Sequence, residues 1–382
     1  DQLVVAVDAE EPRNDVDRSQ HTVHLYAVVD AGVGIVEGRG REEEILGEGW
    51  HMGPGTDHAE VMALRDAQGQ GLSTQGCTAW VTLEPCAHHG RTPPCCDALV
   101  AAGMARVVVA TLDPYPQVNG QGVARLRAAG IEVDIADSSS TVAQAAREIN
   151  IGFFSRIQRA RPWLRMKIAS SLDGRTALAN GRSQWITGAA ARADGHAWRR
   201  RASAILTGIG TVLEDDPRLD VRDVPTQVQP QRVIVDSRLQ TPAAARILRP
   251  PGTVWIYGGD LDEEARQRRA ALASTGCVDI RLLTNTQGKV DLAALLGDLA
   301  TRGVNELHVE AGHKLNASLL RAGLVDELLV YLAPKLIGLG REMAAFGPIE
   351  DLAEALTWRF IEATPVGDDL RVRARPVTRV DP

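Results

Sequence analysis

Four side chains in the first quarter of the chain have the types and the order of a hydrolytic zinc site: His58, Glu60, Cys86 and Cys95. One imidazole and two thiolates can hold a zinc ion and leave its fourth position open for a water molecule. Zinc lowers the pKa of such a water until it becomes a nucleophile near neutral pH. We therefore predict that His58, Cys86 and Cys95 are the metal ligands. Glu60, two residues after the histidine, is predicted to be the catalytic proton carrier.

The spacing of the two cysteines differs from the short one that zinc deaminases share. Their signature is H-x-E followed by P-C-x-x-C, whereas eight residues separate Cys86 from Cys95 here. Cys96 is an alternative ligand, but Pro94-Cys95 repeats the context of Pro85-Cys86 and favours Cys95. The residues between the cysteines are candidates for holding a phosphate or a ring, or belong to a merely exposed loop: His88, His89, Arg91 and Thr92.

Short helices and strands are predicted to position these side chains. His58 begins one predicted helix, Cys95 lies in the first turn of another, and Cys86 follows a predicted strand. The partial positive charge of a helix N-terminus favours a thiolate. Helices and strands alternate over this region, which predicts an α/β layer. The predicted helices are 58–68, 93–102 and 122–129, and the predicted strands are 78–83, 106–110 and 131–133.

Bulk properties limit the class of protein. A length of 382 residues predicts two domains. The net charge of −7 gives no reason to expect a nucleic acid partner, and no apolar run reaches the length of a membrane span. The first residues lack the pattern of a secretory signal, and three of the five cysteines lie within ten residues. Metal chemistry in the reducing cytoplasm is therefore expected.

The second half of the chain begins after a predicted boundary near residues 150–160. Its predicted strands are 163–169, 204–207, 231–236, 254–257, 306–309 and 327–332. Val309-Glu310-Ala311-Gly312 runs from a strand through a turn into a helix from about Lys314, which is a natural anion cradle. No G-x-G-x-x-G motif follows a strand, so a Rossmann dinucleotide site is not supported.

Motifs from both halves together resemble the bifunctional deaminase–reductase family of riboflavin biosynthesis. The resemblance extends from about residue 45 to about residue 372. The long cysteine spacing distinguishes this family from cytidine and tRNA deaminases, which it resembles in fold. The motifs that carry the resemblance are His58-Ala59-Glu60, the segment from Cys86 to Cys95, Ser171-Leu172-Asp173-Gly174, Asp215-Asp216-Pro217 and Glu310-Ala311-Gly312.

The resemblance implies an α/β chain with two activities. Residues 1–150 would form a zinc-dependent deaminase domain with a cytidine-deaminase-like three-layer fold. Residues 160–382 would form a dihydrofolate-reductase-like domain that uses NADPH. The first would deaminate 2,5-diamino-6-ribosylamino-4(3H)-pyrimidinone 5′-phosphate, and the second would reduce its ribosyl group to ribityl. The implied cofactors are Zn²⁺ and NADPH, the partner is this phosphorylated pyrimidine, and the chain would be a homo-oligomer.

The same resemblance implies site residues in the second half. Those expected to contact NADP are Ser170, Trp185, Thr211, Asp215, Ser237 and Gly312. Those expected to contact the substrate are Ser183, Arg199, Leu219, Arg222 and Glu310. A guanidinium can fork onto a phosphate, and an indole can stack on a planar ring. The alternatives are core packing for Trp185 and a solvated helix end for Arg199, Arg200 and Arg201.

Two departures from the family pattern concern the deaminase half. The family has a Pro-Asn-Pro segment before its first strand, whereas this chain has Asp30 where the asparagine would stand, and Tyr115 replaces a second asparagine. One alternative is therefore a reductase with a deaminase domain impaired by its atypical N-terminal segment. Another is a scaffold that only binds nucleotides. Glu60 argues against the scaffold, because metal binding alone does not need it.

Overall fold

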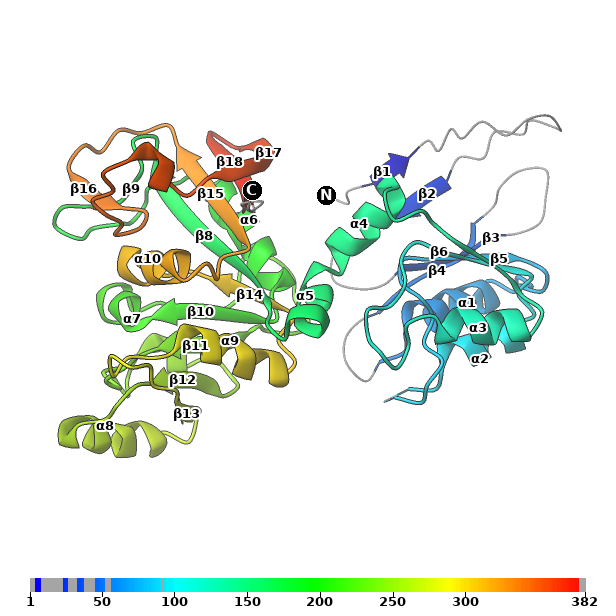
Figure 1. Cartoon of the computed structure of the whole chain (residues 1–382), viewed down its shortest axis with the longest axis horizontal. Coiled ribbons are helices and arrows are strands. Elements are labelled where there is room, and N and C mark those ends of the chain that lie inside the picture. Colours follow the sequence, from blue (N-terminus) through cyan, green and yellow to red (C-terminus); the bar gives the residue numbers. More distant parts are fainter. Residues whose placement is uncertain are drawn as a thin grey trace. The chain divides into compact units, whose positions relative to one another are not determined.

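The computed structural model describes residues 4–7, 23–26, 33–37, 45–51, 56–90 and 92–377. The first three ranges are the backbones of strands β1 (Val4–Val7), β2 (Val23–Tyr26) and β3 (Val33–Glu37). The chain divides into two compact units, Asp1–Gln158 and Arg159–Pro382. Each unit has its own sheet (Figure 1). Within the described ranges, no helix has both the length and the apolar character needed to cross a membrane.

The first unit is built on a five-stranded mixed sheet in the order β4-β3-β5-β6-β7. β3 pairs antiparallel with β4 and β5, whereas β5, β6 and β7 run parallel. β1 and β2 form a separate antiparallel pair. The bounds are β4 (Ile45–Trp50), β5 (Thr78–Val81), β6 (Arg106–Val109) and β7 (Glu132–Ile135).

Three helices cover one face of this sheet (Figure 1): α1 (Ala59–Gly69), α2 (Cys95–Ala101) and α3 (Gln121–Ala128). They and the strands share one apolar core, which includes Leu46, Ala63, Ala79, Leu99, Val107, Val109, Leu126 and Val133. Two further helices follow β7, α4 (Thr141–Ile149) and α5 (Ile151–Arg159). The Ser140 hydroxyl caps α4 by accepting a hydrogen bond from the Ala143 amide at 3.2 Å.

Small residues let α1 lie directly on β4. A Cβ atom at Gly49 would stand 2.2 Å from the carbonyl oxygen of Ala59 and 2.3 Å from the amide of Ala63. A Cβ atom at Gly47 would meet the backbone of Ala63 and Ala67 in the same way. The glycines and the alanines at every fourth helical position therefore fix the height of α1 above the sheet. That contact determines where the first turn of α1 lies.

The second unit is built on a nine-stranded sheet in the order β13-β12-β11-β10-β14-β8-β15-β18-β17. The strands from β13 to β15 in this order run parallel, and β18 and β17 then add antiparallel. The bounds are β8 (Trp163–Ser171), β10 (Ala204–Gly208), β11 (Gln231–Val235), β12 (Val254–Gly258), β13 (Val278–Leu282), β14 (Glu306–Val309), β15 (Glu327–Ala333), β17 (Trp358–Val366) and β18 (Asp369–Pro376). A small second sheet pairs β9 (Arg175–Leu178) with β16 (Gly340–Glu342).

Helices cover both faces of the large sheet, as buried parallel strands require. Leu206 packs with α9 (Leu292–Thr301) and α10 (His313–Arg321), whereas its neighbour Ile205 packs on the opposite face with α7 (Ile209–Asp215) and α8 (Glu263–Ala273). On that opposite face, α6 (Ala189–Arg201) packs against Leu329 and Tyr331 of β15. Two short 3₁₀ turns, Arg246–Leu248 and Leu352–Glu354, complete the connections.

A buried ion network lies beneath α6. Arg165 of β8, which is 1% exposed, donates to Glu306 of β14 and to Glu327 of β15, both at 2.7 Å. Arg373 and Arg375 of β18 also donate to Glu327, at 3.1 and 2.9 Å. Burial alone would raise the pKa of Glu327, but these guanidinium groups hold it far below its ordinary value. The network therefore ties β18 to the centre of the sheet.

Candidate active sites

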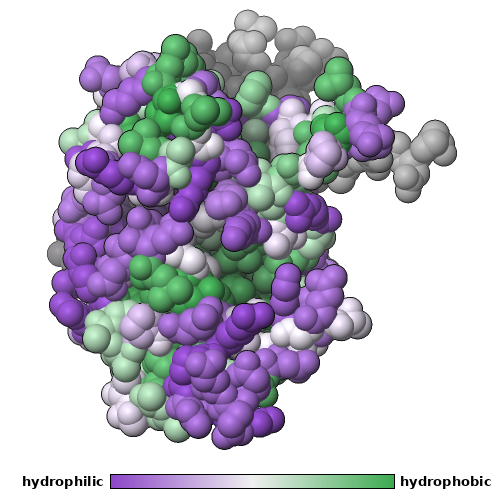
Figure 2. Space-filling model, turned by 90° about the vertical axis from the view of Figure 1, so that its left-hand side faces the viewer, coloured by the Kyte–Doolittle hydropathy of each residue, from purple (hydrophilic) through white to green (hydrophobic). Residues whose placement is uncertain are grey.

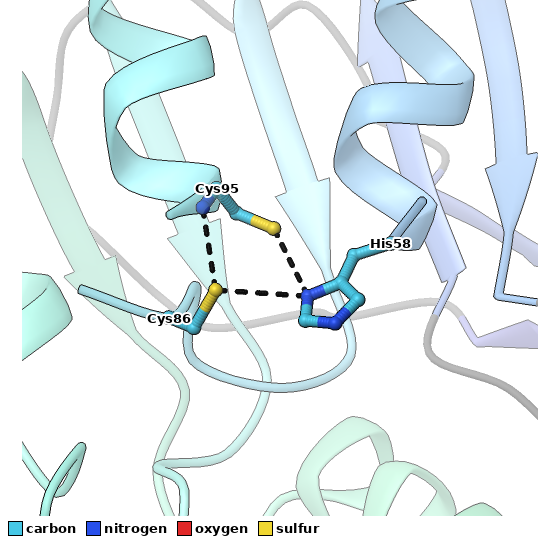
Figure 3. Close-up of side chains that lie close together, drawn as sticks. All are labelled: His58, Cys86 and Cys95. Atoms are coloured by element: carbon cyan, nitrogen blue, oxygen red, sulfur yellow. Dashed lines mark hydrogen bonds between the residues drawn. The ribbon is translucent and has the colours of Figure 1, made fainter. Parts of the chain in front are cut away.

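The predicted metal ligands lie together in the first unit (Figure 3). His58 precedes α1, Cys86 lies in the loop after β5, and Cys95 is the first residue of α2. Nδ1 of His58 lies 3.2 Å from Sγ of Cys95 and 3.6 Å from Sγ of Cys86. All three ligand atoms lie within 4.8 Å of one another, as the ligands of one metal ion must. One nitrogen and two sulfur donors fit zinc.

The electrostatics of the two cysteines favour a cation between them. A hydrogen bond from Cys95 lowers the pKa of Cys86, while the hydrogen bond to Cys86 and burial raise the pKa of Cys95. The pair therefore holds one negative charge readily and a second only against repulsion. The Cys95 amide also donates to Sγ of Cys86 at 3.3 Å. A divalent metal supplies the charge that keeps both thiols deprotonated.

Glu60 lies in the first turn of α1, close to the three ligands. Burial raises the pKa of its carboxyl group, against the opposing effects of its own amide and of His58. A carboxyl group whose pKa is shifted toward neutral is suited to giving and taking protons.

The neighbour of Cys95 points elsewhere. Cys96 is fully buried, and its thiol donates to the carbonyl oxygen of Pro85 at 3.3 Å and to that of Gly122 at 3.6 Å. Consecutive helical residues project about 100° apart, so only one of the two can face His58. The structure brings Cys95 to His58 and uses Cys96 to hold the loop that carries Cys86.

The other loop candidates are only partly placed. The His88 ring lies 6.3 Å from the ring of Tyr115, while His89 is exposed and Thr92 is half-buried. Asp113 accepts a hydrogen bond from the Tyr115 amide at 2.7 Å, and burial raises the pKa of Asp113 to about 6. Arg91 and Asp30 lie outside the described residues. The effect predicted for Asp30 therefore stays a prediction.

The second unit contains a cavity of about 1480 Å³ at the carboxyl ends of β10, β11, β12 and β14. This is where open α/β sheets bind their ligands. Three of the residues predicted to contact NADP line it: Thr211, Ser237 and Gly312. Gly312 precedes α10, which has no side-chain cap, so the first amides of that helix are available to a phosphate. Figure 2 views this side of the molecule and shows a hydrophobic band between hydrophilic zones.

The other residues predicted to contact NADP do not line this cavity. Ser170 is fully buried at the end of β8, and its hydroxyl donates to the carbonyl oxygen of Ser171 at 3.1 Å. Asp215 accepts a hydrogen bond from the Ser183 hydroxyl at 3.3 Å. Trp185 is 65% exposed, with the Arg192 guanidinium 4.7 Å from its ring centroid. The alternative of core packing for Trp185 is therefore wrong.

Three of the residues predicted to contact substrate form a connected group. Arg199 donates from Nε and Nη2 to the two oxygens of Glu310 at 2.5 and 2.9 Å, and from Nη1 to the carbonyl oxygen of Asp220 at 3.0 Å. The guanidinium of Arg222 pairs with the carboxylate of Asp220. Arg199 is therefore paired rather than solvated at the end of its helix. Arg201 is also paired, with Glu306, whereas Arg200 is exposed as the alternative expected. Leu219 is 3% exposed, so its side chain belongs to the core.

Two residues of these sites were missed by sequence reasoning. Glu84 is 3% exposed and accepts hydrogen bonds from three backbone amides. Asp220 is 6% exposed and pairs with Arg218 and Arg222. The sequence did contain a signal for Glu84. A charged residue between an apolar strand and Pro85-Cys86 is expected to be buried, and a buried charge needs a hydrogen-bonding or ionic partner.

Comparison with known proteins agrees with both halves. Residues 21–111 match the model of the cytidine and deoxycytidylate deaminase zinc-binding region, and residues 162–372 match that of the RibD C-terminal domain. The riboflavin biosynthesis protein RibD of Escherichia coli is 44% identical over 343 residues, which are 86% of this chain and 89% of that protein. That of Aquifex aeolicus is 40% identical over 330 residues, covering 86% and 88%.

Solved structures give the same result for nearly the whole chain. Acinetobacter baumannii RibD superimposes with a TM-score of 0.78 at 39% identity and covers 91% of this chain and 92% of its own. A Thermotoga maritima structure, named a diaminohydroxyphosphoribosylaminopyrimidine deaminase/5-amino-6-(5-phosphoribosylamino)uracil reductase, has a TM-score of 0.77 at 30% identity, with the same coverage.

Fold and sites together define a deaminase with a zinc-binding region joined to a reductase, so the predicted α/β fold class is confirmed. The chain belongs to the RibD family. It carries both the deaminase and the reductase of riboflavin biosynthesis. The presence of both domains favours the two-step enzyme over the reductase with an impaired deaminase.

Proposed function

We propose that the chain converts 2,5-diamino-6-ribosylamino-4(3H)-pyrimidinone 5′-phosphate in two steps. Deamination replaces one ring amino group with oxygen and releases ammonia. Reduction with NADPH then converts the ribosyl group to ribityl. The observation that carries the proposal is the meeting of His58, Cys86 and Cys95 within 4.8 Å, because three protein ligands leave the fourth position of a zinc ion open, as in catalytic sites, whereas structural zinc sites have four protein ligands. The name of the Thermotoga maritima relative supports both steps.

In the deaminase step, this chain's own residues bind and move protons. His58, Cys86 and Cys95 would hold Zn²⁺, which when bound supplies an activated water molecule. The Glu60 carboxylate would accept the proton that the attacking water gives up and would donate it to the departing amine. Burial raises the pKa of Glu60, which favours its protonated form relative to an exposed glutamate. We assign the binding of the pyrimidine to the half-buried His88 and Tyr115, whose rings lie 6.3 Å apart.

In the reductase step, the protein supplies mainly binding and orientation. NADPH would lie in the 1480 Å³ cavity, with its phosphates at the amides after Gly312 and with Thr211 and Ser237 beside it. Ser170, Trp185 and Asp215 are assigned to the same cofactor by family resemblance. Arg199, Arg222 and Glu310, with Ser183 and Leu219, are assigned to the substrate. The partial burial of the Arg199–Glu310 pair strengthens its interaction with a polar substrate.

Product analysis with and without NADPH tests the proposal. The purified chain, assayed for bound zinc, should form the deaminated pyrimidine without NADPH and the ribityl product with it. A chain that reduces an authentic deaminated substrate but never forms it from the diaminopyrimidine would support the reductase-only alternative. A chain that contains no zinc and deaminates fully would contradict the metal assignment.

We also assign the deaminase to residues 1–150 and the reductase to residues 160–382, and we propose that the enzyme is a homo-oligomer. The oligomer is supported by the family resemblance. Light scattering on the eluted protein measures its mass directly, and a mass of one chain at micromolar concentration would overturn this proposal.

A further inference from the structure

We propose that Glu84 is a positioning residue for the deaminase site: its carboxylate sets the place of Cys86 and of the loop that carries Asp113 and Tyr115. This inference rests on the proposed function of the zinc site. Glu84 is 3% exposed, and its two oxygens accept three backbone hydrogen bonds, from Gly120 at 2.9 Å, Val123 at 3.2 Å and Asp113 at 3.3 Å. Among the described residues, no cationic side chain pairs with Glu84. Backbone amides therefore provide its stabilisation.

The three amides come from two separate segments. Asp113 lies in the loop after β6, whereas Gly120 and Val123 lie at the start of α3. The amide of Glu84 itself donates to the carbonyl oxygen of Thr111 at 3.0 Å. One side chain thus joins three parts of the first unit, namely the loop after β5, the loop after β6 and the N-terminus of α3. The helix N-terminus favours the negative charge.

Glu84 is rigidly connected to the metal ligand. Only Pro85 separates it from Cys86, and the proline ring fixes one of the intervening backbone dihedrals. A Cβ atom at Gly122 would lie 2.1 Å from the carbonyl oxygen of Pro85, so the segment packs directly on α3. The thiol of Cys96 donates to the same carbonyl oxygen. A displacement of Glu84 would therefore move Cys86.

Glu84 is also connected to the loop that carries Tyr115. Glu84 accepts a hydrogen bond from the Asp113 amide, and the Asp113 carboxylate accepts one from the Tyr115 amide at 2.7 Å. The Tyr115 ring in turn lies 6.3 Å from the His88 ring. The same carboxylate therefore fixes both the metal ligand and the loop of Tyr115, which the proposed function assigns to the pyrimidine, so its loss should affect zinc affinity and KM together. Partners outside the ligand set commonly contribute 10–100-fold to metal affinity, as an order of magnitude.

The test compares Glu84→Ala and Glu84→Gln with wild type in the full chain, with Glu132→Ala, an exposed glutamate of β7, as the matched control. Zinc affinity is measured by competition with a chelator, and coordination geometry by the sulfur-to-metal absorption of the cobalt(II)-substituted protein. We expect Glu84→Ala to lower zinc affinity by about 10–100-fold, alter the cobalt spectrum and raise KM for deamination. Glu84→Gln, which replaces one acceptor oxygen by a donor, should give a smaller change in the same direction. Glu132→Ala should match wild type.

NADPH oxidation with a deaminated substrate serves as the internal control for folding of the rest of the chain and should not change. A Glu84→Gln variant that is folded and has the wild-type zinc affinity, cobalt spectrum and KM would overturn the proposal, even if its melting temperature falls. If Glu84→Ala does not fold, Glu84→Gln alone decides. The metal measurements need no substrate, so a wild-type chain that binds zinc without deaminating would contradict the proposed function and leave this comparison valid.

Discussion

Arg199 and Glu310 face each other as a two-point ion pair, with guanidinium-to-carboxylate distances of 2.5 and 2.9 Å and both side chains less than one-fifth exposed. They stand on α6 and directly after β14, 111 residues apart in the chain. The pair thus connects a helix to the end of a central strand beside the proposed substrate position. Its geometry supports the first two predictions.

Arg199→Lys should destabilise the second unit and weaken substrate binding. A lysine ammonium cannot reproduce a planar two-point contact, so the variant loses a hydrogen bond to a charged group, worth about 1.5–3 kcal/mol. Urea unfolding followed by tryptophan fluorescence measures the free energy of unfolding, and NADPH oxidation measures KM. Arg200→Lys is the control, because that exposed arginine makes only a 3.4 Å contact with the carbonyl oxygen of Pro225. Equal effects of the two substitutions would contradict this role of the pair.

The stabilisation by the pair should persist to low pH. Burial would raise the pKa of Glu310, but the charge of Arg199 holds it well below its ordinary value. A carboxylate with a lowered native pKa stabilises the fold above its unfolded pKa of about 4.3, and this contribution is lost as the pH falls through the lower native value. The difference in unfolding free energy between wild type and Glu310→Gln should therefore be constant from pH 7 to about pH 5 and shrink only below about pH 4. A difference that already disappears at pH 6 would show that the carboxylate is not held in this way.

Glu60→Gln should remove deamination while leaving zinc content unchanged. The amide keeps the size of the side chain but cannot carry the proton, and loss of general acid–base catalysis costs about 10²–10⁴-fold in rate. Metal analysis and NADPH oxidation on the same preparation provide the controls. Full deamination by this variant would assign proton transfer to another group.

Substitution of the adjacent cysteines should separate their roles. Cys95→Ala removes a donor within hydrogen-bonding distance of His58, so the purified variant should lose zinc and deamination together. Cys96→Ala removes a contact with Pro85 but no ligand, so zinc should remain bound, with a loss of stability of about 1 kcal/mol. Metal content after dialysis against a chelator is the readout. Retention of zinc by Cys95→Ala and its loss from Cys96→Ala would reverse the ligand assignment.

Gly49→Ala should disturb the zinc site from a distance. Its new Cβ atom would stand 2.2 Å from the backbone of Ala59, so α1 must shift, at a cost of about 1–3 kcal/mol. His58 and Glu60 move with that helix, and both zinc retention and the melting temperature of the first unit should fall. Gly69→Ala in the same helix meets no atom within 4 Å and should be neutral or slightly stabilising. Identical behaviour of the two variants would contradict the close approach of α1 and β4.

Local pattern predicted the apolar strands well. The strands expected in the second half correspond to β8, β10, β11, β12, β14 and β15, because strands buried on both faces are short continuous apolar runs. β17 and β18 were not predicted. They carry arginines and glutamates that pair across the sheet, such as Arg371 with Glu362, so their sequence resembles a polar loop. α6 was not delimited for a similar reason, since the residues that it buries are Ala191, Gly195 and His196, which do not form a stripe of large apolar side chains.

The cluster of His58, Cys86 and Cys95 was predictable because the chemistry of a metal site is encoded in residue type and order. Partners that meet only in the fold were not. Nothing in the spacing of Arg199 and Glu310 indicates that each neutralises the other, and nothing near Glu84 identifies the amides of Gly120 and Val123. The same holds for cavity membership, since Thr211 and Ser237 line the cavity and Ser170 does not.

The ion pairs between Glu327 and β18 determine when the fold of the second unit can be completed during synthesis. Glu327 leaves the ribosome before Arg373, its partner 46 residues later. At a synthesis rate of about 5–20 residues per second, roughly two to nine seconds separate the synthesis of Glu327 from that of Arg373. During this time, Arg165 is the only cation of the network beside Glu327 that has already been made. The nascent reductase half therefore passes through a stage in which its sheet lacks β18 and the charge of Glu327 is not fully neutralised. A chain terminated prematurely at that stage would be a natural target for chaperones and proteases.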